Sequence, residues 1–304
     1  MQNHYYQVSN YKVGPEYEGV RLDNCLISKL KGLPRAKIYS IIRKGEVRIN
    51  KSRSKPSYRL QINDIIRIPP YTVKPKINKK ASDINKDKII HSIMRVEKDF
   101  LILNKPAGIA CHGGSGISLG LIETIRQLDK NYREAQLVHR IDKDTSGCLV
   151  VALKKQILRE FHKEIRDKHV DKIYSAVVKG KWPKNLNKIQ LSLKKESLKS
   201  GERFVQVNKK GKFSETEFEL ISSGKSNSLV KAKIITGRTH QIRVHSKYKG
   251  HPIVGDTKYG DPLYNKELQL TGLNRMLLHA KSIKFSNMGI EQSAPLPPVF
   301  KDYV

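Results

Sequence analysis

Two consecutive runs of the sequence decide the fold: the polar run His139-Arg140-Ile141-Asp142-Lys143-Asp144-Thr145-Ser146-Gly147 and the apolar run Cys148-Leu149-Val150-Val151-Ala152. The apolar run predicts a buried strand. The polar run places two carboxylates, an arginine, a histidine and two hydroxyls in eight positions and ends in a glycine suited to a tight turn. Because charged groups beside a buried strand need partners or a function, we expect a loop that presents them at the mouth of the strand. A solvated turn with an ion pair is the alternative.

The segments around this strand predict a mixed, mainly antiparallel sheet with flanking helices. Apolar residues recur at helical spacing between Ile157 and Ile165. Further strands are predicted from Phe100 onward, at 173–178, and at 215–220 and 229–235, the last two paired around a turn rich in Ser, Gly and Asn. No regular βαβ alternation is found, so the predicted fold class is α+β.

The N-terminal part predicts a small separate module. Apolar residues recur at helical spacing over 22–30 and again over 38–42, where Gly45 follows. Segments 47–50 and 64–68 alternate as strands do. The predicted organisation is a flexible tail at 1–17, the module at 18–72, a charged linker at 73–88 and a large domain at 89–304.

The charge of the chain indicates a polyanionic partner. Its 304 residues include 59 Lys and Arg against 28 Asp and Glu, a formal net charge of +31. Nucleic acid is the first partner that such a balance suggests. Part of the lysine excess could reflect an AT-rich genome, so the sign carries more weight than the magnitude.

Cysteines and the N-terminus indicate a cytoplasmic protein. Cys25, Cys111 and Cys148 lie far apart without a CxxC pair, which argues against a disulfide framework or a cysteine-rich zinc site. The first residues show no signal-peptide pattern, and no apolar run reaches membrane-spanning length. The glycine-rich segment 112–116 lacks the spacing of a phosphate-binding loop.

The order of residues in the polar run resembles the catalytic loop of the RluA-type pseudouridine synthases, His-Arg-Leu-Asp-x-x-Thr-Ser-Gly. Ile141 replaces the usual leucine, and Asp142 falls on the catalytic aspartate. The resemblance implies that the C1′–N1 bond of a uridine is broken, the base turns, and C5 is joined to C1′. A carboxylate nucleophile suits this chemistry, whether it attacks the base or the ribose or acts through a glycal-type intermediate. Asp144 is the rival carboxylate, expected in a turn or surface pair.

Two further motifs supply partners for Asp142. The run Gly237-Arg238-Thr239-His240-Gln241-Ile242-Arg243-Val244-His245 resembles a family motif in which Arg238 maps to the basic residue that pairs with the catalytic aspartate. Arg243 is expected to bind phosphate or to form a structural ion pair. His240 and His245 could be a metal pair, but no third ligand is evident, so no metal or other cofactor is predicted.

Substrate contacts follow from the same resemblance. Tyr174 matches the tyrosine that stacks on the target base, although an ordinary core tyrosine is the alternative. A stacked uracil cannot reach the aspartate, so the base must be flipped out. In the family, the arginine beside the histidine of the loop can fill the vacated space, which assigns that role to Arg140. His139 is expected to be a structural hydrogen-bonding residue.

The N-terminal module resembles the S4 RNA-binding domain, through Arg21-Leu22-Asp23, Arg35 and Gly45-Glu46-Val47-Arg48-Ile49-Asn50. A small capping subdomain with a solvated basic face is the alternative. The residues expected to contact RNA on the second helix are Arg35, Lys37, Arg43 and Lys44.

Segments 200–203, 211–216 and 272–280 resemble the branch of the family that modifies 23S ribosomal RNA. The expected partner is therefore 23S ribosomal RNA or the pre-ribosomal large subunit, bound by a monomer. Three rival functions remain: a non-catalytic RNA-binding assembly factor, a family member acting on another RNA, and a metal-dependent hydrolase using Asp142 and Asp144. The last needs more clustered carboxylates than the sequence offers.

Overall fold

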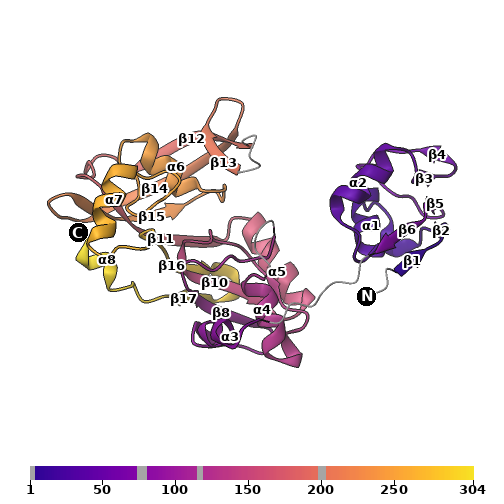
Figure 1. The fold of residues 1–304 in the computed structure, drawn as a ribbon, viewed down its shortest axis with the longest axis horizontal. Coiled ribbons are helices and arrows are strands. Elements are labelled where there is room, and N and C mark those ends of the chain that lie inside the picture. Colours follow the sequence, from indigo (N-terminus) through magenta and orange to yellow (C-terminus); the bar gives the residue numbers. More distant parts are fainter. Residues whose placement is uncertain (1–3, 74–80, 115–118, 198–202) are drawn as a thin grey trace. The chain divides into compact units, whose positions relative to one another are not determined.

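The computed structural model describes residues 4–73, 81–114, 119–197 and 203–304. The chain forms two compact units, Met1–Asn78 and Lys79–Val304 (Figure 1). Each has its own hydrophobic core. The α+β fold class, with a small module followed by a large mixed-sheet domain, is confirmed.

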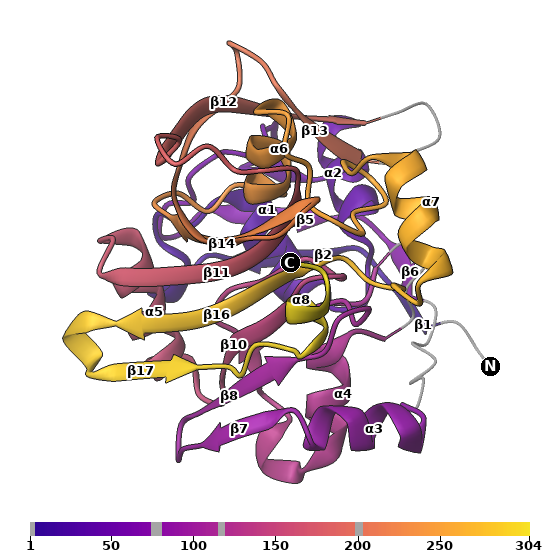
Figure 2. The same ribbon diagram turned by 90° about the vertical axis from the view of Figure 1, so that its left-hand side faces the viewer.

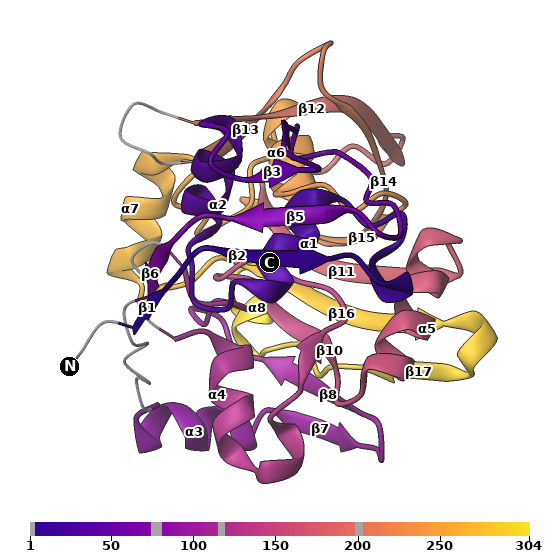
Figure 3. The ribbon, with the colours of Figure 1, turned by 90° about the vertical axis from the view of Figure 1, so that its right-hand side faces the viewer.

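The first unit contains two helices and a small sheet. Helices α1 (Leu22–Lys29) and α2 (Arg35–Arg43) bury their apolar residues against strands in the order β2 (Ser9–Lys12), β5 (Ile65–Ile68), β3 (Arg48–Ile49) and β4 (Ser52–Arg53). Figure 3 shows β3, β5 and β2 side by side. The predicted helices and the two predicted strand segments are confirmed, and the two strands pair with each other.

The flexible tail predicted at 1–17 is wrong where the structure describes it. Residues His4–Tyr6 form β1, which pairs with β6 (Tyr71–Val73), and β2 pairs with β5. The rings of Tyr6 in β1 and Tyr71 in β6 stack with their centroids 4.7 Å apart. A short 3-10 helix, η1 (Pro15–Tyr17), completes the segment.

The C-terminal half of the predicted linker is also wrong. Residues Asp83–Ile90 form helix α3, whose first turn is capped by the Ser82 hydroxyl accepting from Asn85 N–H at 3.4 Å. Ile89 is buried in the core of the second unit, and α3 lies beside α4 (Leu121–Leu128) (Figure 2). Residues 74–80 of that linker lie outside the described residues.

An 11-stranded sheet organises the second unit. Its order is β13 (Arg203–Val207), β12 (Lys188–Ser197), β14 (Lys212–Ser223), β15 (Asn227–Ile234), β11 (Val170–Lys179), β16 (Leu278–Phe285), β10 (Ser146–Ala152), β8 (Phe100–Lys105) and β7 (Ile93–Val96). Strand β17 (Ile290–Ser293) pairs with β16 and β9 (Gln136–Leu137) with β10. The described pairs are antiparallel except β10 with β16, so the predicted mainly antiparallel sheet is confirmed.

Helices cover both faces of this sheet. They are α3, α4, α5 (Lys155–Arg166), α6 (Gln241–Tyr248), α7 (Pro262–Leu270) and α8 (Val299–Asp302), with 3-10 turns η2 (Lys130–Tyr132) and η3 (Ser286–Met288). Every residue of β10 is buried. Leu149 and Val151 face the core that contains α4, whereas Cys148 and Val150 face the core that contains Phe161 of α5. Burial on both faces explains the uninterrupted apolar run.

Gly147 allows β10 to approach β16 closely. Its φ is +112°, and a Cβ at this position would clash with the carbonyl oxygen of Ala280. No other residue type fits that contact without moving the strand. The glycine that ends the polar run therefore lies in the first residues of β10, next to β16.

Candidate active site

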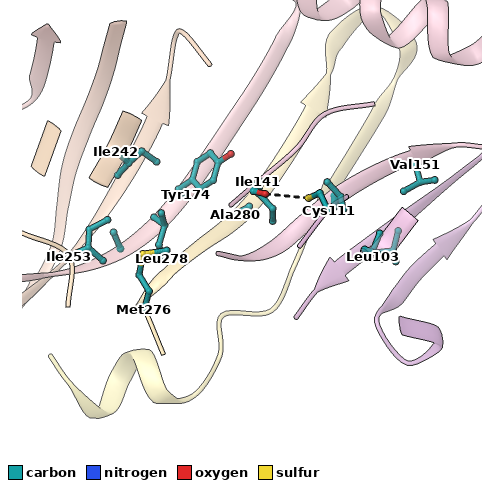
Figure 4. Packing of buried hydrophobic residues seen from close by; sticks show 14 of the residues in the cluster. Leu103, Cys111, Ile141, Val151, Tyr174, Ile242, Ile253, Met276, Leu278 and Ala280 are labelled. Atoms are coloured by element: carbon teal, nitrogen blue, oxygen red, sulfur yellow. Dashed lines mark hydrogen bonds between the residues drawn. The ribbon is translucent and has the colours of Figure 1, made fainter. Parts of the chain in front are cut away.

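The loop before β10 is fixed to the core through its backbone. The Cys111 thiol donates to the Ile141 carbonyl at 3.2 Å (Figure 4). On the other side of Asp142, the Lys143 carbonyl accepts from the Lys105 ammonium at 2.9 Å. Lys105 is fully buried, and burial lowers its pKa to about 8. The backbone on both sides of Asp142 is therefore held in place.

Asp142 is paired with Arg243. Arg243 Nη1 donates to Asp142 Oδ2 at 3.0 Å. The same guanidinium binds Asp256 in a bidentate arrangement, from Nε to Oδ2 at 2.7 Å and from Nη2 to Oδ1 at 2.8 Å. Burial acts to lower the pKa of Arg243, but the hydrogen bonds and charges of the two aspartates outweigh it and raise that pKa. Arg243 therefore remains a fixed cation beside Asp142.

The prediction that Arg238 pairs with Asp142 is wrong. Arg238 is exposed, and its Nε donates to the Phe213 carbonyl at 2.9 Å. The difference arises at His240, which adopts a left-handed conformation with φ of 53° directly before α6. This turn leaves Arg238 at the surface and directs Arg243, on the buried helix, towards Asp142. Arg243 was expected to bind phosphate or to form a structural ion pair, and the structure shows ion pairs.

His240 and Tyr259 form a second layer around the pair. His240 Nδ1 lies 2.8 Å from the Tyr259 hydroxyl, which accepts from Val205 N–H at 2.8 Å. His240 Nε2 is 3.8 Å from Asp142 Oδ1, too far for a hydrogen bond. Burial lowers the pKa of His240, so the neutral ring contributes no ion pair at neutral pH. Asp142 Oδ1 therefore accepts no hydrogen bond among the described residues.

Tyr174 lies on β11 among the core residues near Asp142. The residue is 8% exposed, and Figure 4 shows its ring between Ile242 and Ile141 with the hydroxyl directed away from the packed side chains. Within the described residues, this hydroxyl has no hydrogen-bond partner. Burial, and then the charge of Asp142, raises the pKa of Tyr174, so the phenol stays protonated. Tyr174 therefore has an apolar ring face and a hydroxyl without a partner among the described residues.

These side chains line one cavity of about 770 Å³. Asp142, Tyr174 and Arg243 contribute to its wall, and so do the exposed Arg140 and Arg238. Asp144 is partly exposed in the turn and is absent from that lining. The structure thus brings together all four predicted site residues, with Arg238 at the surface rather than on the carboxylate.

The histidines have structural roles. His139 Nε2 accepts from Val150 N–H at 3.2 Å, and burial lowers the pKa of His139 to about 3, as expected for a structural hydrogen-bonding residue. His245 lies 2.8 Å from the Ser214 hydroxyl and does not share a site with His240. Among the described residues, no group of three or more His, Cys, Asp or Glu could hold a metal ion.

Sequence reasoning missed Asp256 and Tyr259. Asp256 is fully buried, and although burial acts to raise its pKa, the hydrogen bonds and charge of Arg243 lower it. The Arg243 guanidinium also lies 5.0 Å from the centre of the Tyr259 ring. The sequence did contain one indication of such a partner. Arg243 stands between Ile242 and Val244 in an apolar stretch, and a buried arginine needs a carboxylate, but the neighbouring residues do not identify which carboxylate it is.

The four cations predicted on the second helix of the first unit are exposed. Arg35, Lys37 and Arg43 lie on α2, and Lys44 is its C-terminal cap. None of them forms an ion pair in the part of the chain that the structure describes. They are free to meet phosphate groups.

Comparisons with known proteins support both units. Residues 99–248 match the family model described as RNA pseudouridylate synthase, and residues 20–66 match that of the S4 domain. The chain is 49% identical over 282 residues to ribosomal large subunit pseudouridine synthase C of Haemophilus ducreyi, covering 92% of this chain and 88% of that protein. It is 46% identical over 275 residues to the protein of that name from Escherichia coli, covering 89% and 86%.

A solved structure agrees with the fold. Human RNA pseudouridylate synthase domain containing 1 superposes with a TM-score of 0.55 at 27% identity, covering 67% of this chain and 82% of that one. Within residues 4–73, 81–114, 119–197 and 203–304, none of the helices has the length and apolar character needed to cross a bilayer.

Proposed function

Because the chain belongs to the RNA pseudouridylate synthase family, we propose that it converts selected uridines of 23S ribosomal RNA to pseudouridine, with Asp142 as the nucleophile. Membership rests on relatives that share 46–49% of their residues with this chain across most of their length. The S4 domain at its N-terminus is an RNA-binding module, as expected. The relatives' name refers to the large ribosomal subunit, which supports 23S RNA, free or in an assembling subunit, as the substrate.

The carboxylate arrangement supports a nucleophilic role for Asp142. Oδ2 accepts from Arg243 at 3.0 Å, whereas Oδ1 accepts no hydrogen bond among the described residues, and Asp142 lines the cavity. Oδ1 is the oxygen available for attack. The bidentate hold of Asp256 on Arg243 fixes the guanidinium, so the pair requires no rearrangement when a substrate enters.

Tyr174 and Arg140 suit the handling of the target nucleotide. A flipped uracil can stack on the Tyr174 ring, and the free hydroxyl can donate to a carbonyl of the base. Arg140 is exposed at the cavity, two residues before Asp142, where it can fill the space that the flipped base leaves in the RNA. Arg238, at the surface of the same cavity, is free to meet the backbone.

The reaction is an isomerisation. The C1′–N1 bond breaks, the C1′–C5 bond forms, C5 loses a proton and N1 gains one, so no oxidant, nucleotide or metal is consumed. A non-catalytic assembly factor would have no use for a carboxylate, a fixed guanidinium and an aromatic ring in one cavity. This grouping is the observation that favours the enzyme. A ribosomal substrate and three unpaired cysteines fit a cytoplasmic location.

The decisive experiment compares wild type with Asp142→Asn in EDTA. Chemical mapping of pseudouridine in 23S RNA, from cells with and without the gene, first identifies the target uridines. Purified wild-type protein is expected to modify those uridines in transcribed RNA without added metal. Asp142→Asn should bind the RNA as tightly and form no pseudouridine, a loss of at least about 10⁴-fold.

Two outcomes would contradict the proposal. Pseudouridine formed by Asp142→Asn would remove the nucleophile assignment. An unchanged 23S map in cells that lack the gene would exclude this RNA as the substrate. Asp144→Asn is the matched control, because that carboxylate lies in the same turn but outside the cavity lining, and it should retain activity.

A further inference from the structure

Lys172 is a partly buried cation of the cavity and has no anionic partner among the described residues. Lys172 lies two residues before Tyr174 on β11 and lines the same cavity. Its ammonium has no hydrogen bond or ion pair within the described residues. Burial lowers its pKa, and no neighbouring carboxylate offsets that effect. Because a desolvated cation without a partner costs free energy, its position calls for a ligand.

The ammonium of Lys172, unpaired among the described residues, contrasts with that of Lys105. The buried Lys105 ammonium donates to three carbonyl oxygens, those of Pro106, Ile109 and Lys143, at 2.8–2.9 Å. All of its donors are used, so Lys105 is a structural residue. The donors of the partly buried Lys172 remain available to a molecule that enters the cavity.

The surroundings of Lys172 are positive. Arg166 and Lys168, at the end of α5 and just beyond it, line the same cavity and are exposed. The carboxylate of the adjacent Asp171 forms an ion pair with Lys233 at 2.7 Å, and that of Asp142 is bound to Arg243. The neutral His139 ring is close enough for the charge of Lys172 to lower its pKa further. An anion would be stabilised here.

We propose that Lys172 binds the phosphodiester adjacent to the flipped uridine. This inference rests on the proposed function. Residues two apart on a strand are about 7 Å apart, so a base stacked on Tyr174 places its own sugar-phosphate within reach of the Lys172 side chain. The exposed Arg166 and Lys168 continue the positive wall from Lys172 outward, as a continuing RNA backbone requires.

The test neutralises single phosphates in the RNA. A synthetic fragment of 23S RNA containing the mapped uridine is prepared with a methylphosphonate at the 5′ or the 3′ linkage of that uridine, or at a linkage several nucleotides away. With wild-type protein, one of the two adjacent substitutions should lower kcat/KM about tenfold or more, whereas the distant one should have little effect.

The variant Lys172→Met completes a double-mutant cycle. It should lower kcat/KM on unmodified RNA to a similar extent and should be insensitive to the same methylphosphonate, because the two changes remove one interaction. Lys233→Met is the matched control, a lysine on the neighbouring strand paired with Asp171, and it should retain full sensitivity. Thermal melting of both variants checks their folding.

The outcomes separate the two proposals. Wild type inactive on the unmodified fragment would contradict the proposed function. Wild type that is active but indifferent to both adjacent methylphosphonates would overturn the phosphate contact, as expected if Lys172 instead binds a carbonyl of uracil. Additive losses from Lys172→Met and the methylphosphonate would overturn it as well. If Lys172→Met does not fold, indifference of the wild type to both adjacent methylphosphonates still overturns the phosphate contact.

Discussion

The two units of this chain use charge in opposite ways. Residues 1–78 contain 16 Lys and Arg against 5 Asp and Glu, and the cations associated with α2 are exposed and unpaired within the described residues. The second unit buries a few charges in fixed geometry, with Arg243 bound by both Asp142 and Asp256. The first unit carries dispersed surface charge, which is accessible to a polyanion. The second unit buries a small number of charged side chains.

The difference follows from the two tasks. Exposed cations bind phosphates through interactions that salt screens and that tolerate changes of geometry. A reacting carboxylate needs a partner that does not move and is little screened, and this requires burial. Burial in turn makes the second unit dependent on complete pairing, since a buried charge without its partner is strongly destabilising. Changes to charge should therefore affect the two units very differently.

The largest effect is expected from Arg243→Met. The substitution leaves Asp256 buried without a counter-charge and frees Asp142, so we expect at least about a thousandfold loss of activity and about 3–5 kcal/mol of stability in the second unit. Arg21→Met in the first unit also removes an aspartate's partner, but Arg21 is half exposed and Asp23 keeps hydrogen bonds from Tyr39 and the Asn24 N–H.

Activity assays and thermal unfolding followed separately for each unit test this contrast. Arg21→Met should leave kcat unchanged and destabilise only the first unit, and to a smaller extent. Arg243→Lys, which restores the charge without the bidentate geometry, should recover part of the stability but little activity. Equal losses of stability from Arg243→Met and Arg21→Met would refute the contrast.

The second expected effect is a pH dependence of the free energy of unfolding, confined to the second unit. Burial lowers the pKa of His139 to about 3 and of His245 and His279 to about 4. In the unfolded chain these rings titrate near the ordinary value of about 6.5. Below that pH the unfolded state binds more protons, so stability is fully present above about pH 7 and falls as the pH drops towards 4.

For three such histidines the free energy of unfolding should fall by about 4 kcal/mol between pH 7.5 and 5.5. The first unit contains only His4, which is exposed, and its stability should change little over this range. Hydrogen exchange measured at both pH values, corrected for intrinsic rates, resolves the two units. Equal pH sensitivity in both would contradict the burial of these rings.

Local sequence patterns predicted much of the fold and, at the site, the loop that carries Asp142 but not the arginine that pairs with it. The strand at β10, helix α5 and the paired strands β14 and β15 follow from runs of apolar residues with a clear period. Strands β1 and β2 were missed, because their residues are mostly exposed and gain their structure from pairing with later segments. Pairing across many residues leaves no local pattern.

The cation beside Asp142 shows the same limit. Arg238 and Arg243 belong to one motif, and their order in sequence does not reveal which one faces the carboxylate. The left-handed conformation of His240 decides it, and the partner that holds Arg243 in place, Asp256, lies 13 residues further along the chain. The loop with Asp142 was predictable because its identity is contained in nine consecutive residues.

The smallest effect is expected at the cations associated with α2. Changing Arg35, Lys37, Arg43 and Lys44 together to Gln should weaken RNA binding about tenfold at 0.15 M salt and leave kcat unchanged, since none of them belongs to the cavity lining. The slope of log Kd against log salt should fall by about 0.7–0.9 for each phosphate that the variant no longer neutralises. Anisotropy measurements in the Asp142→Asn background hold the substrate unconverted.

Lys231 and Lys284 provide the matched control for that experiment. Both are solvent-accessible lysines of the second unit, but each is already paired with a glutamate, Glu219 at 2.8 Å and Glu291 at 3.0 Å. Changing both to Gln should alter the salt slope less than any two of the α2 cations do. An unchanged slope in the α2 variant would mean that the exposed cations of the first unit do not bind RNA. The difference between exposed charge in the first unit and buried charge in the second would then have no functional meaning.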